Sequence, residues 1–290
     1  MTTFDYHQAF SRNIGWVTPE EQEVLNQSRV AIAGMGGVGG VHLLTLTRLG
    51  IGKFHIADLD HFEQANFNRQ IGANMDTLTR EKVTVLGEMA KQINPGLDVQ
   101  TFESGVDADS IDAFLEGADV YVDGLDFFVL PVRRKVFARC RELGIPAVTA
   151  APLGMGTALL SFLPDSMPFD EYFGLTDQPL LEQYLRFYVG LAPNALHRGY
   201  LVMPEKIDLA GGKGPSTMMG CNLCAGVAAT ETLKLILKRG SVKPAPHSFQ
   251  FDAYHNKLAH CWRPGGHRHP LQQLILWLGR RQLRKQGADL

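Results

Sequence analysis

Over the first 160 residues, the pattern of apolar and polar positions alternates between two periods. Apolar runs with the length of buried strands occur at 30–33, 53–60, 97–102, 118–126 and 146–151. Stretches with helical periodicity separate them, at about 38–49, 80–93, 109–116 and 129–143. Strands that alternate with helices predict a parallel sheet with right-handed crossovers. We therefore predict an α/β fold with a doubly wound, Rossmann-like, mostly parallel sheet.

The second half of the chain has a different pattern. Residues 157–164 read as an antiparallel strand, and 247–262 read as two strands with a turn near His255. Between them, 165–215 shows little regular pattern, and 217–237 is an apolar helix rich in small residues that we expect to pack on the sheet. The sheet is therefore expected to finish in antiparallel C-terminal strands.

These patterns divide the chain into four parts. We expect an N-terminal arm and helix over 1–28, in which Thr18 and Pro19 start the helix. We expect a nucleotide-binding Rossmann-like domain over 29–163, and a substrate loop with the completing helix and strands of the same domain over 164–265. The tail, 266–290, reads as an amphipathic helix with a basic end. Such a helix covers its own domain, docks a partner or lies on a membrane surface, and the first of these is the commonest outcome.

Composition excludes several classes of protein. Twenty-eight Lys and Arg against 30 Asp and Glu argue against a chain that coats nucleic acid. Four cysteines in 290 residues do not make a disulfide framework. The polar start lacks the apolar region of a signal peptide, and no apolar run is long enough to span a bilayer. We expect a cytoplasmic protein that meets membranes, if at all, only through the tail.

A glycine-rich turn indicates a nucleotide site. Gly34, Gly36 and Gly39, with Gly37 between them, fit G-x-G-x-x-G between the first strand and the first helix. Such a turn brings backbone N–H groups to a phosphate at a helix N-terminus. Asp58, about 20 residues on, is placed to bind ribose hydroxyls. These residues alone fit an NAD(P) oxidoreductase as well as an ATP enzyme.

The residues that follow favour ATP. After Asp58 come Asp60, the N-x-x-R-Q group of Asn66, Arg69 and Gln70, then Lys82 and the D-x-x-D pair of Asp123 and Asp126; Arg12 precedes an Ile-Gly step near the N-terminus. With these motifs in this order, the chain resembles the ThiF/MoeB/HesA superfamily, the bacterial relatives of ubiquitin-activating enzymes. The resemblance covers about 10–163 well and 217–238 loosely.

The resemblance implies ATP-dependent activation of a carboxylate, which gives an acyl-adenylate and pyrophosphate. It implies that Asp58 binds the ribose, that Asn66, Arg69 and Lys82 hold the triphosphate, and that Asp126 holds Mg²⁺. It further implies that Gln70 places the carboxylate or phosphates, and that Arg12 reaches the partner subunit's ATP site in a homodimer. Displacement at phosphorus needs positioning and positive charge, whereas hydride transfer needs neither Arg69 nor Lys82. Asp60 is expected either at the nucleotide or as a cap, and Asp123 as a structural acid at a strand end.

The chain departs from the family in its cysteines. Many members bind zinc through two C-x-x-C pairs, but here only Cys221 and Cys224 form one. Cys261 with His267 or His269 lacks the paired spacing, so we expect buried cysteines and no zinc. The family places a thioester-forming cysteine in the long loop, and 151–215 contains none. We therefore expect direct transfer to an external nucleophile, with 211–215 around Lys213 as a lid or a solvated loop.

Four functions follow, in decreasing order of fit. The first is adenylation of a carboxylate on a small ubiquitin-like carrier protein, a peptide or a small molecule. The second is dehydration of threonylcarbamoyladenosine in tRNA, which requires a basic face. The third is a nucleotide-binding scaffold without chemistry, and the fourth is an NAD(P)-dependent oxidoreductase. The sequence does not specify which carboxylate is the substrate.

Overall fold

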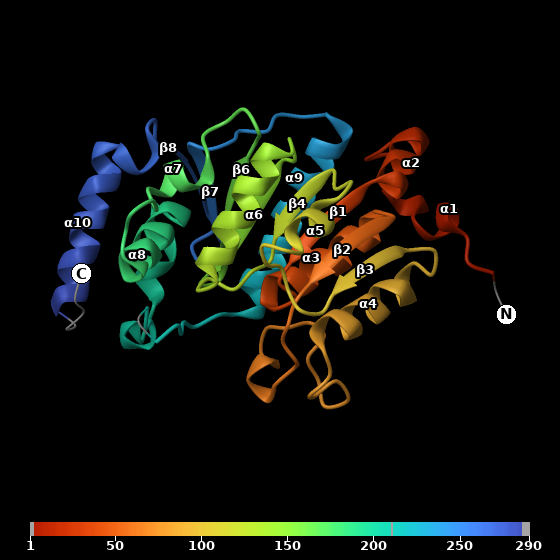
Figure 1. Cartoon of the computed structure of the whole chain (residues 1–290), viewed down its shortest axis with the longest axis horizontal. Coiled ribbons are helices and arrows are strands. Elements are labelled where there is room, and N and C mark those ends of the chain that lie inside the picture. Colours follow the sequence, from red (N-terminus) through yellow and green to blue (C-terminus); the bar gives the residue numbers. More distant parts are fainter. Residues whose placement is uncertain (1–2, 210, 286–290) are drawn as a thin grey trace.

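One mixed sheet forms the centre of the molecule, as seen in a computed structural model that describes residues 3–209 and 211–285 (Figure 1). Within this part of the chain, the sheet has eight strands in the order β3-β2-β1-β4-β5-β6-β7-β8. The strands from β3 to β5 in this order pair in parallel, and those from β5 to β8 pair antiparallel. Their bounds are β1 (Arg29–Ala33), β2 (Lys53–Ala57), β3 (Asp98–Phe102), β4 (Val120–Asp123), β5 (Ala147–Leu153), β6 (Gly156–Phe162), β7 (His247–Asp252) and β8 (Lys257–Trp262). This confirms the predicted doubly wound sheet with antiparallel C-terminal strands.

Helices cover both faces of the sheet and bury two apolar cores. Val30 and Ile32 of β1 point to one core, and Ala31 and Ala33 point to the other, as the period of two in a strand requires. The first core is closed by α2 (Pro19–Gln27), α3 (Gly37–Leu49), α4 (Lys82–Ile93) and α9 (Met218–Leu237). The second is closed by α5 (Ile111–Leu115), α6 (Leu130–Glu142), α7 (Phe169–Phe173) and α8 (Leu180–Leu191).

The remaining helical elements lie at the ends of the chain and in loops. α1 (Tyr6–Ala9) belongs to the N-terminal arm, and α10 (Pro270–Lys285) packs on α8 at the opposite end of the molecule (Figure 1). Short 3₁₀ turns are η1 (Ser11–Asn13), η2 (Gln64–Asn66), η3 (Leu196–Tyr200), η4 (Pro204–Lys206) and η5 (Gly266–Arg268). Segment 165–215 thus holds more regular structure than its sequence pattern predicts, because α8 buries Leu185 and Phe187 as a regular helix.

We call the edge of the sheet beyond the carboxyl ends of β1, β2 and β4 the crevice. From β1 the chain moves to β2 and β3 on one side, and later to β4 and β5 on the other side. The carboxyl ends of β1, β2 and β4 therefore meet at one edge, where the order reverses. Ligands of open α/β sheets bind at such a point. Gly34, Asp58 and Gly124 follow these three strand ends directly.

Candidate nucleotide-binding site

The glycine turn at the end of β1 is packed backbone against backbone. Gly34 has a φ of +88°, and its N–H donates to the carbonyl of Ala57 at 2.7 Å. A side chain on Gly34 would collide with the carbonyl oxygen of Gly124, and one on Gly39 would collide with the carbonyl oxygen of Gly34. These glycines are required by packing at the point where β1, β4 and α3 meet.

Gly36 occupies a different environment. The nearest atom to a Cβ built on Gly36 is Nε2 of Gln70, at 3.7 Å, and Gly36 is the N-cap of the 13-residue helix α3. Because no backbone lies against it, the absent side chain leaves space in front of the first N–H groups of α3. A phosphate bound there would be favoured by the helix dipole and by the first N–H groups of α3.

Asp58 lies beside this turn and is held by backbone donors. Its carboxylate accepts from the N–H of Met35 at 2.5 Å and from the N–H of Asp60 at 2.8 Å. Burial raises the pKa of Asp58, although Lys82 and the two N–H groups act in the opposite direction. The side chain is thereby fixed at the end of β2, where a ribose bound at the crevice would lie.

Two cations predicted for the triphosphate flank the turn. Lys82 begins α4, is buried, and forms an ion pair from Nζ to Oδ2 of Asp60 at 2.9 Å. Arg69 donates only to oxygens of its own segment, the carbonyl of Ala65 at 2.9 Å and Oδ1 of Asn68 at 3.0 Å. Among residues 3–209 and 211–285, no carboxylate pairs with Arg69. Its charge is therefore available to an anion.

Asn66 and Gln70 are buried on the same segment but differ in their hydrogen bonds. Oδ1 of Asn66 accepts the N–H of Glu63 at 2.9 Å and so caps η2. Oε1 of Gln70 is buried and has no partner among the described residues. A buried amide oxygen without a donor costs free energy, so this atom marks a place where a ligand or solvent hydrogen completes the site.

The turn after β4 presents Asp126 and is fixed by a buried ion pair. Nε of Arg133 donates to Oδ2 of Asp123 at 2.8 Å, and both side chains are almost fully buried. Arg133 also donates to the carbonyls of Leu125 at 2.5 Å and Phe127 at 3.3 Å, which flank Asp126. Asp126 itself is exposed at the crevice edge. The structural role expected of Asp123 is thus supported, and Arg133 is a residue that the sequence analysis missed.

Arg12 lies away from the turn in its own chain. It is exposed on η1, and its neighbour Asn13 donates to the carbonyl of Leu49 at 3.0 Å, at the far end of α3 from Gly37. At 1.5 Å per residue, a 13-residue helix separates these ends by roughly 18 Å. Arg12 does not approach the site of its own chain.

The first turn of α9 closes the crevice from the other side, which the sequence analysis also missed. Sγ of Cys221 lies 3.1 Å from where a Cβ of Gly37 would be, and Cγ of Arg69 lies 3.6 Å from it. Arg69 is therefore a cationic neighbour of Cys221, although the two residues are 152 positions apart in the sequence. Burial nevertheless raises the pKa of Cys221, which disfavours the thiolate. Cys140, Cys224 and Cys261 are buried as well.

The glycine-rich loop after η4 lies over this crevice. Gly212 faces the ring of Phe128, with 3.7 Å from its built Cβ to Cγ of the ring. Nδ2 of Asn68 donates to the carbonyl of Ser216 at 3.0 Å. The loop therefore connects the Arg69 segment with the Asp126 turn, which is the position that a lid requires. Lys213 is exposed on it.

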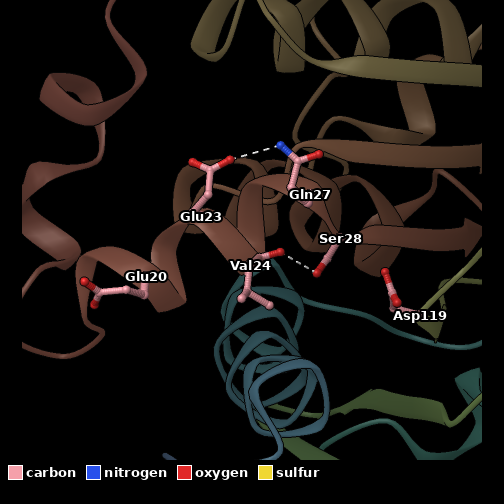
Figure 2. A pocket seen from close by; sticks show the side chains of 6 residues that line it. All are labelled: Glu20, Glu23, Val24, Gln27, Ser28 and Asp119. Carbon is pink, nitrogen blue, oxygen red and sulfur yellow. Dashed lines mark hydrogen bonds between the residues drawn. The ribbon is translucent and has the colours of Figure 1, made fainter.

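A hollow at the opposite edge of the sheet is unsuited to phosphate. Figure 2 shows its lining, in which Ser28 and Asp119 directly precede β1 and β4. Its other polar groups include Glu20 and Glu23. It therefore lies at the amino ends of the parallel strands, and its carboxylates repel a nucleotide.

The arrangement fits a nucleotide that brings its own metal ion. Among residues 3–209 and 211–285, no group of three or more His, Cys, Asp and Glu side chains is placed to hold a metal. Mg²⁺ is commonly bound by one or two carboxylates together with substrate phosphates. Asp126, exposed at the crevice, fits that mode.

A comparison with protein families decides between the nucleotide-binding classes. The model of the ThiF family matches residues 10–272. The chain belongs to the ThiF family. This confirms the resemblance carried by the glycine turn, Asn66, Arg69, Gln70 and Lys82.

Similar proteins include other members of this ThiF group. The SAMP-activating enzyme E1 of Haloferax volcanii is 29% identical over 224 residues, which cover 77% of this chain and 73% of that protein. The tRNA threonylcarbamoyladenosine dehydratase of Haemophilus influenzae is 28% identical over 151 residues, or 52% of this chain and 57% of that protein. Among solved structures, Escherichia coli MccB with ATP matches with a TM-score of 0.64 and 18% identity, covering 87% of this chain and 70% of that chain. This last likeness shows the shared fold.

Proposed function

We propose that this ThiF-family protein adenylates a carboxylate with ATP. The observation that carries the proposal is the set of groups around Gly36, where Arg69 has no acidic partner and Oε1 of Gln70 has no donor among the described residues. The Arg69 guanidinium suits the phosphates of ATP, and Oε1 of Gln70, an acceptor, suits a nucleotide hydroxyl, an amino group or solvent. Hydride transfer by an NAD(P) oxidoreductase releases no pyrophosphate whose charge Arg69 would offset.

In the proposed reaction, a substrate carboxylate oxygen attacks the α-phosphorus of ATP. The new bond joins that oxygen to phosphorus, and the bond from phosphorus to the bridging oxygen breaks, so that pyrophosphate leaves with the electron pair. Arg69 and Lys82 offset the charge that develops on the leaving group. Asp58 orients the ribose, while Asn66 and Gln70 position phosphates and carboxylate. When bound at Asp126, Mg²⁺ supplies further charge neutralisation.

The acceptor step is proposed to need no covalent enzyme intermediate. Residues 151–215 contain no cysteine, and burial raises the pKa of Cys221 above that of an ordinary thiol. A nucleophile from outside the protein is therefore expected to attack the acyl-adenylate directly. Trapping of a thioester on Cys221 or Cys224 would contradict this step.

The carboxylate is proposed to belong to a peptide or carrier-protein C-terminus. Two observations support a long substrate: the archaeal relative is named as an activating enzyme E1, and the glycine-rich loop at 211–217 contacts the site through the bond from Asn68 to Ser216. A chain terminus can enter beneath such a loop. Small-molecule carboxylates are the alternative substrates to be tested.

A homodimer would complete the site. Arg12 is far from its own turn, and the arm beside it exposes the apolar side chains of Ile14 and Trp16, the latter with 85% of its surface accessible. An exposed tryptophan four residues from an exposed arginine suits an interface with a second copy. In that dimer, Arg12 would act at the partner's nucleotide.

Isotope exchange between pyrophosphate and ATP tests the adenylation. We expect exchange only with the correct carboxylate, and none with the same peptide ending in an amide. Arg69→Ala should lower the exchange rate about 100- to 1,000-fold. The control Arg48→Ala changes an exposed arginine at the other end of α3 and should leave it unchanged. ATP binding without exchange for any peptide, carrier or small carboxylate would contradict the proposed reaction.

A second candidate is dehydration of threonylcarbamoyladenosine in tRNA, which a relative in Haemophilus influenzae performs by name. The observation that favours it is a run of basic residues over 263–286. Binding of tRNA with a steep dependence on salt would support it.

A further inference from the structure

Helix α10 has one face that is already occupied. Leu276 is fully buried against Leu185 and Val189 of α8, and Gly279 packs on the side chain of Leu185. Nε of Arg280 donates to both carboxylate oxygens of Glu182, at 3.1 and 3.2 Å. The tail therefore covers its own domain, which is the commonest outcome for such a helix.

The opposite face of α10 is apolar and exposed. Its large apolar side chains retain 50–53% of their accessible surface and are Leu271, Leu274, Trp277 and Leu278. The spacing of 271, 274 and 278 places three leucines in one row along the helix. Together with Trp277 they make an apolar stripe along roughly two turns, at the outer end of the molecule (Figure 1).

Arginine side chains border the C-terminal end of the apolar stripe. Arg281 lies over the ring of Trp277, with 5.8 Å from Cζ to the ring centre, and a shallow hollow is lined by Trp277, Arg280, Arg281 and Arg284. Arg280 is paired with Glu182, but Arg281 and Arg284 have no acidic partner among the described residues. Their charge is directed to solvent beside the apolar stripe.

Charge is distributed unevenly between the tail and the body of the protein. Residues 263–286 contain no Asp or Glu and six basic residues, namely Arg263, Arg268, Arg280, Arg281, Arg284 and Lys285. The rest of the chain then holds 22 Lys and Arg against 30 Asp and Glu. The whole chain thus has a small excess of acidic residues, although segment 263–286 is strongly basic and the rest of the chain is acidic.

We infer that the outer face of α10 docks the protein on an anionic membrane surface. A row of leucines with a tryptophan, bordered by arginines, matches a helix that lies in the lipid interface. The apolar stripe enters the boundary of the acyl chains, and Arg281 and Arg284 remain at the anionic headgroups. Among residues 3–209 and 211–285, no helical segment has both the length and the apolarity needed to cross a bilayer, so the contact is peripheral.

Other occupants fit these groups less well. A second copy that paired through the same face would oppose one acid-free basic segment to another, because a two-fold interface repeats the same patch. A nucleic acid would engage the arginines but leave the leucines in water, since its backbone offers phosphates. An anionic lipid surface satisfies both the charge and the apolar stripe.

Vesicle flotation of the full chain tests the inference. We expect binding to vesicles of equal parts phosphatidylcholine and phosphatidylglycerol, and weak binding to phosphatidylcholine alone. Arg281→Gln/Arg284→Gln should weaken partitioning roughly 30-fold and reduce its salt dependence. Leu274→Gln/Leu278→Gln should weaken it by a similar factor or more and leave the salt dependence in place.

Matched controls separate the stripe from general effects. Leu143→Gln changes an exposed leucine at the end of α6, and Arg48→Gln changes an exposed arginine on α3 that has no acidic partner among the described residues; neither should alter binding. With Trp16→Phe/Trp262→Phe, Trp277 is the only tryptophan left, and its emission should shift to the blue with anionic vesicles.

Three results would overturn the inference. They are equal binding to both vesicle types, unchanged binding of the leucine variants, and self-association that the same leucine changes abolish without any binding to vesicles. RNA binding that is lost in the arginine variants but kept in the leucine variants, together with no vesicle binding, would assign the face to nucleic acid. The arginine and leucine variants of α10 should keep the wild-type unfolding midpoint, because the changed side chains lie on the exposed face, away from α8.

Discussion

The parallel and antiparallel halves of the sheet differ in how the polar side chains beside them are paired. In the antiparallel half, several polar groups pair with one another: Tyr200 donates to Asp252 at 2.7 Å, and Glu182 binds both Arg186 and Arg280. Buried atoms without a partner among the described residues occur there as well, at Nε of Arg263 and Oε1 of Gln272, but they do not converge on a strand-end crevice. At the carboxyl edge of the parallel half, Arg69 and Oε1 of Gln70 lack such partners among the described residues. Where buried or convergent polar groups keep unused hydrogen-bonding capacity, a ligand is the expected partner.

The same contrast exists within the parallel half. Asp123 and Asp126 are three residues apart, yet Asp123 is buried with Arg133 and Thr149, while Asp126 is exposed at the crevice. Arg133 binds the carbonyls on either side of Asp126, so one acid builds the turn that presents the other. A buried, ion-paired aspartate thus supports the turn that presents an exposed one, whose Oδ1 accepts only the N–H of Phe128 among the described residues.

The largest effect is expected from breaking the scaffold. Arg133→Met leaves the Asp123 carboxylate buried without its cation and should lower the free energy of unfolding by about 3–5 kcal/mol. Arg139→Met removes a partly exposed arginine that pairs with the exposed carboxylates of Asp112 and Glu142, so its effect should be much smaller. Denaturant unfolding of the two variants measures the difference. Equal costs would show that Asp123 does not depend on Arg133.

Acid should destabilise the antiparallel half through a buried histidine. Burial lowers the pKa of His197 to about 4, and its ring bonds to Tyr188 and Gln250. The unfolded chain takes up this proton near pH 6.5, so stability is full above that pH and falls until about pH 4.

The size of this loss can be isolated by substitution. A shift from 6.5 to about 4 corresponds to roughly 3 kcal/mol. Burial also lowers the pKa of His42, to about 3. Some loss of unfolding free energy in acid therefore remains in every variant that keeps His42. His197→Gln should therefore reduce the drop between pH 6.5 and 4 by about 3 kcal/mol. An unchanged pH profile would contradict the buried neutral state of His197.

Substitution of two glycines in one turn should affect different properties, nucleotide affinity in one case and stability in the other. Gly36→Ala places a methyl group in ordinary van der Waals contact with Nε2 of Gln70, and should weaken binding of Mg·ATP by roughly 100-fold with little change in stability. Gly34→Ala forces a side chain against the carbonyl of Gly124 at positive φ, and should lower the unfolding free energy by about 2 kcal/mol or more. Calorimetric titration and denaturant unfolding of both variants test this. Normal ATP affinity in Gly36→Ala would exclude the turn as the phosphate site.

The smallest effect is expected from a change at Asp58, which distinguishes binding of the ribose from binding of the phosphates. Asp58→Asn removes one charged acceptor and should weaken Mg·ATP about tenfold, because a hydrogen bond to a charged group contributes roughly 1.5–3 kcal/mol. Affinity for Mg·pyrophosphate, which has no ribose, should stay the same. A loss of pyrophosphate affinity of equal size would assign Asp58 to the phosphates.

The predictable part of the site is the part that is local in sequence. Gly34, Gly36 and Asp58 follow strand ends within one strand–helix–strand unit, so their spacing predicts their positions. Cys221 reaches Gly37, and Arg280 reaches Glu182, only after the whole sheet and α8 have assembled. Such contacts join residues about 100 to 180 positions apart and leave no periodic signal. The pairing of Lys82 with Asp60 depends likewise on how α4 enters the crevice.

The central claim is that the turn at Gly34–Gly39 holds ATP, and thermal unfolding with added nucleotide tests it most directly. At about 100 times its Kd, Mg·ATP should stabilise the protein by roughly 2.7 kcal/mol, and Lys82→Ala should reduce that stabilisation. NAD⁺ at the same concentration should have no effect on either protein. Stabilisation by NAD⁺ alone, or a Mg·ATP effect that is unchanged in Lys82→Ala, would contradict the assignment of this crevice to ATP.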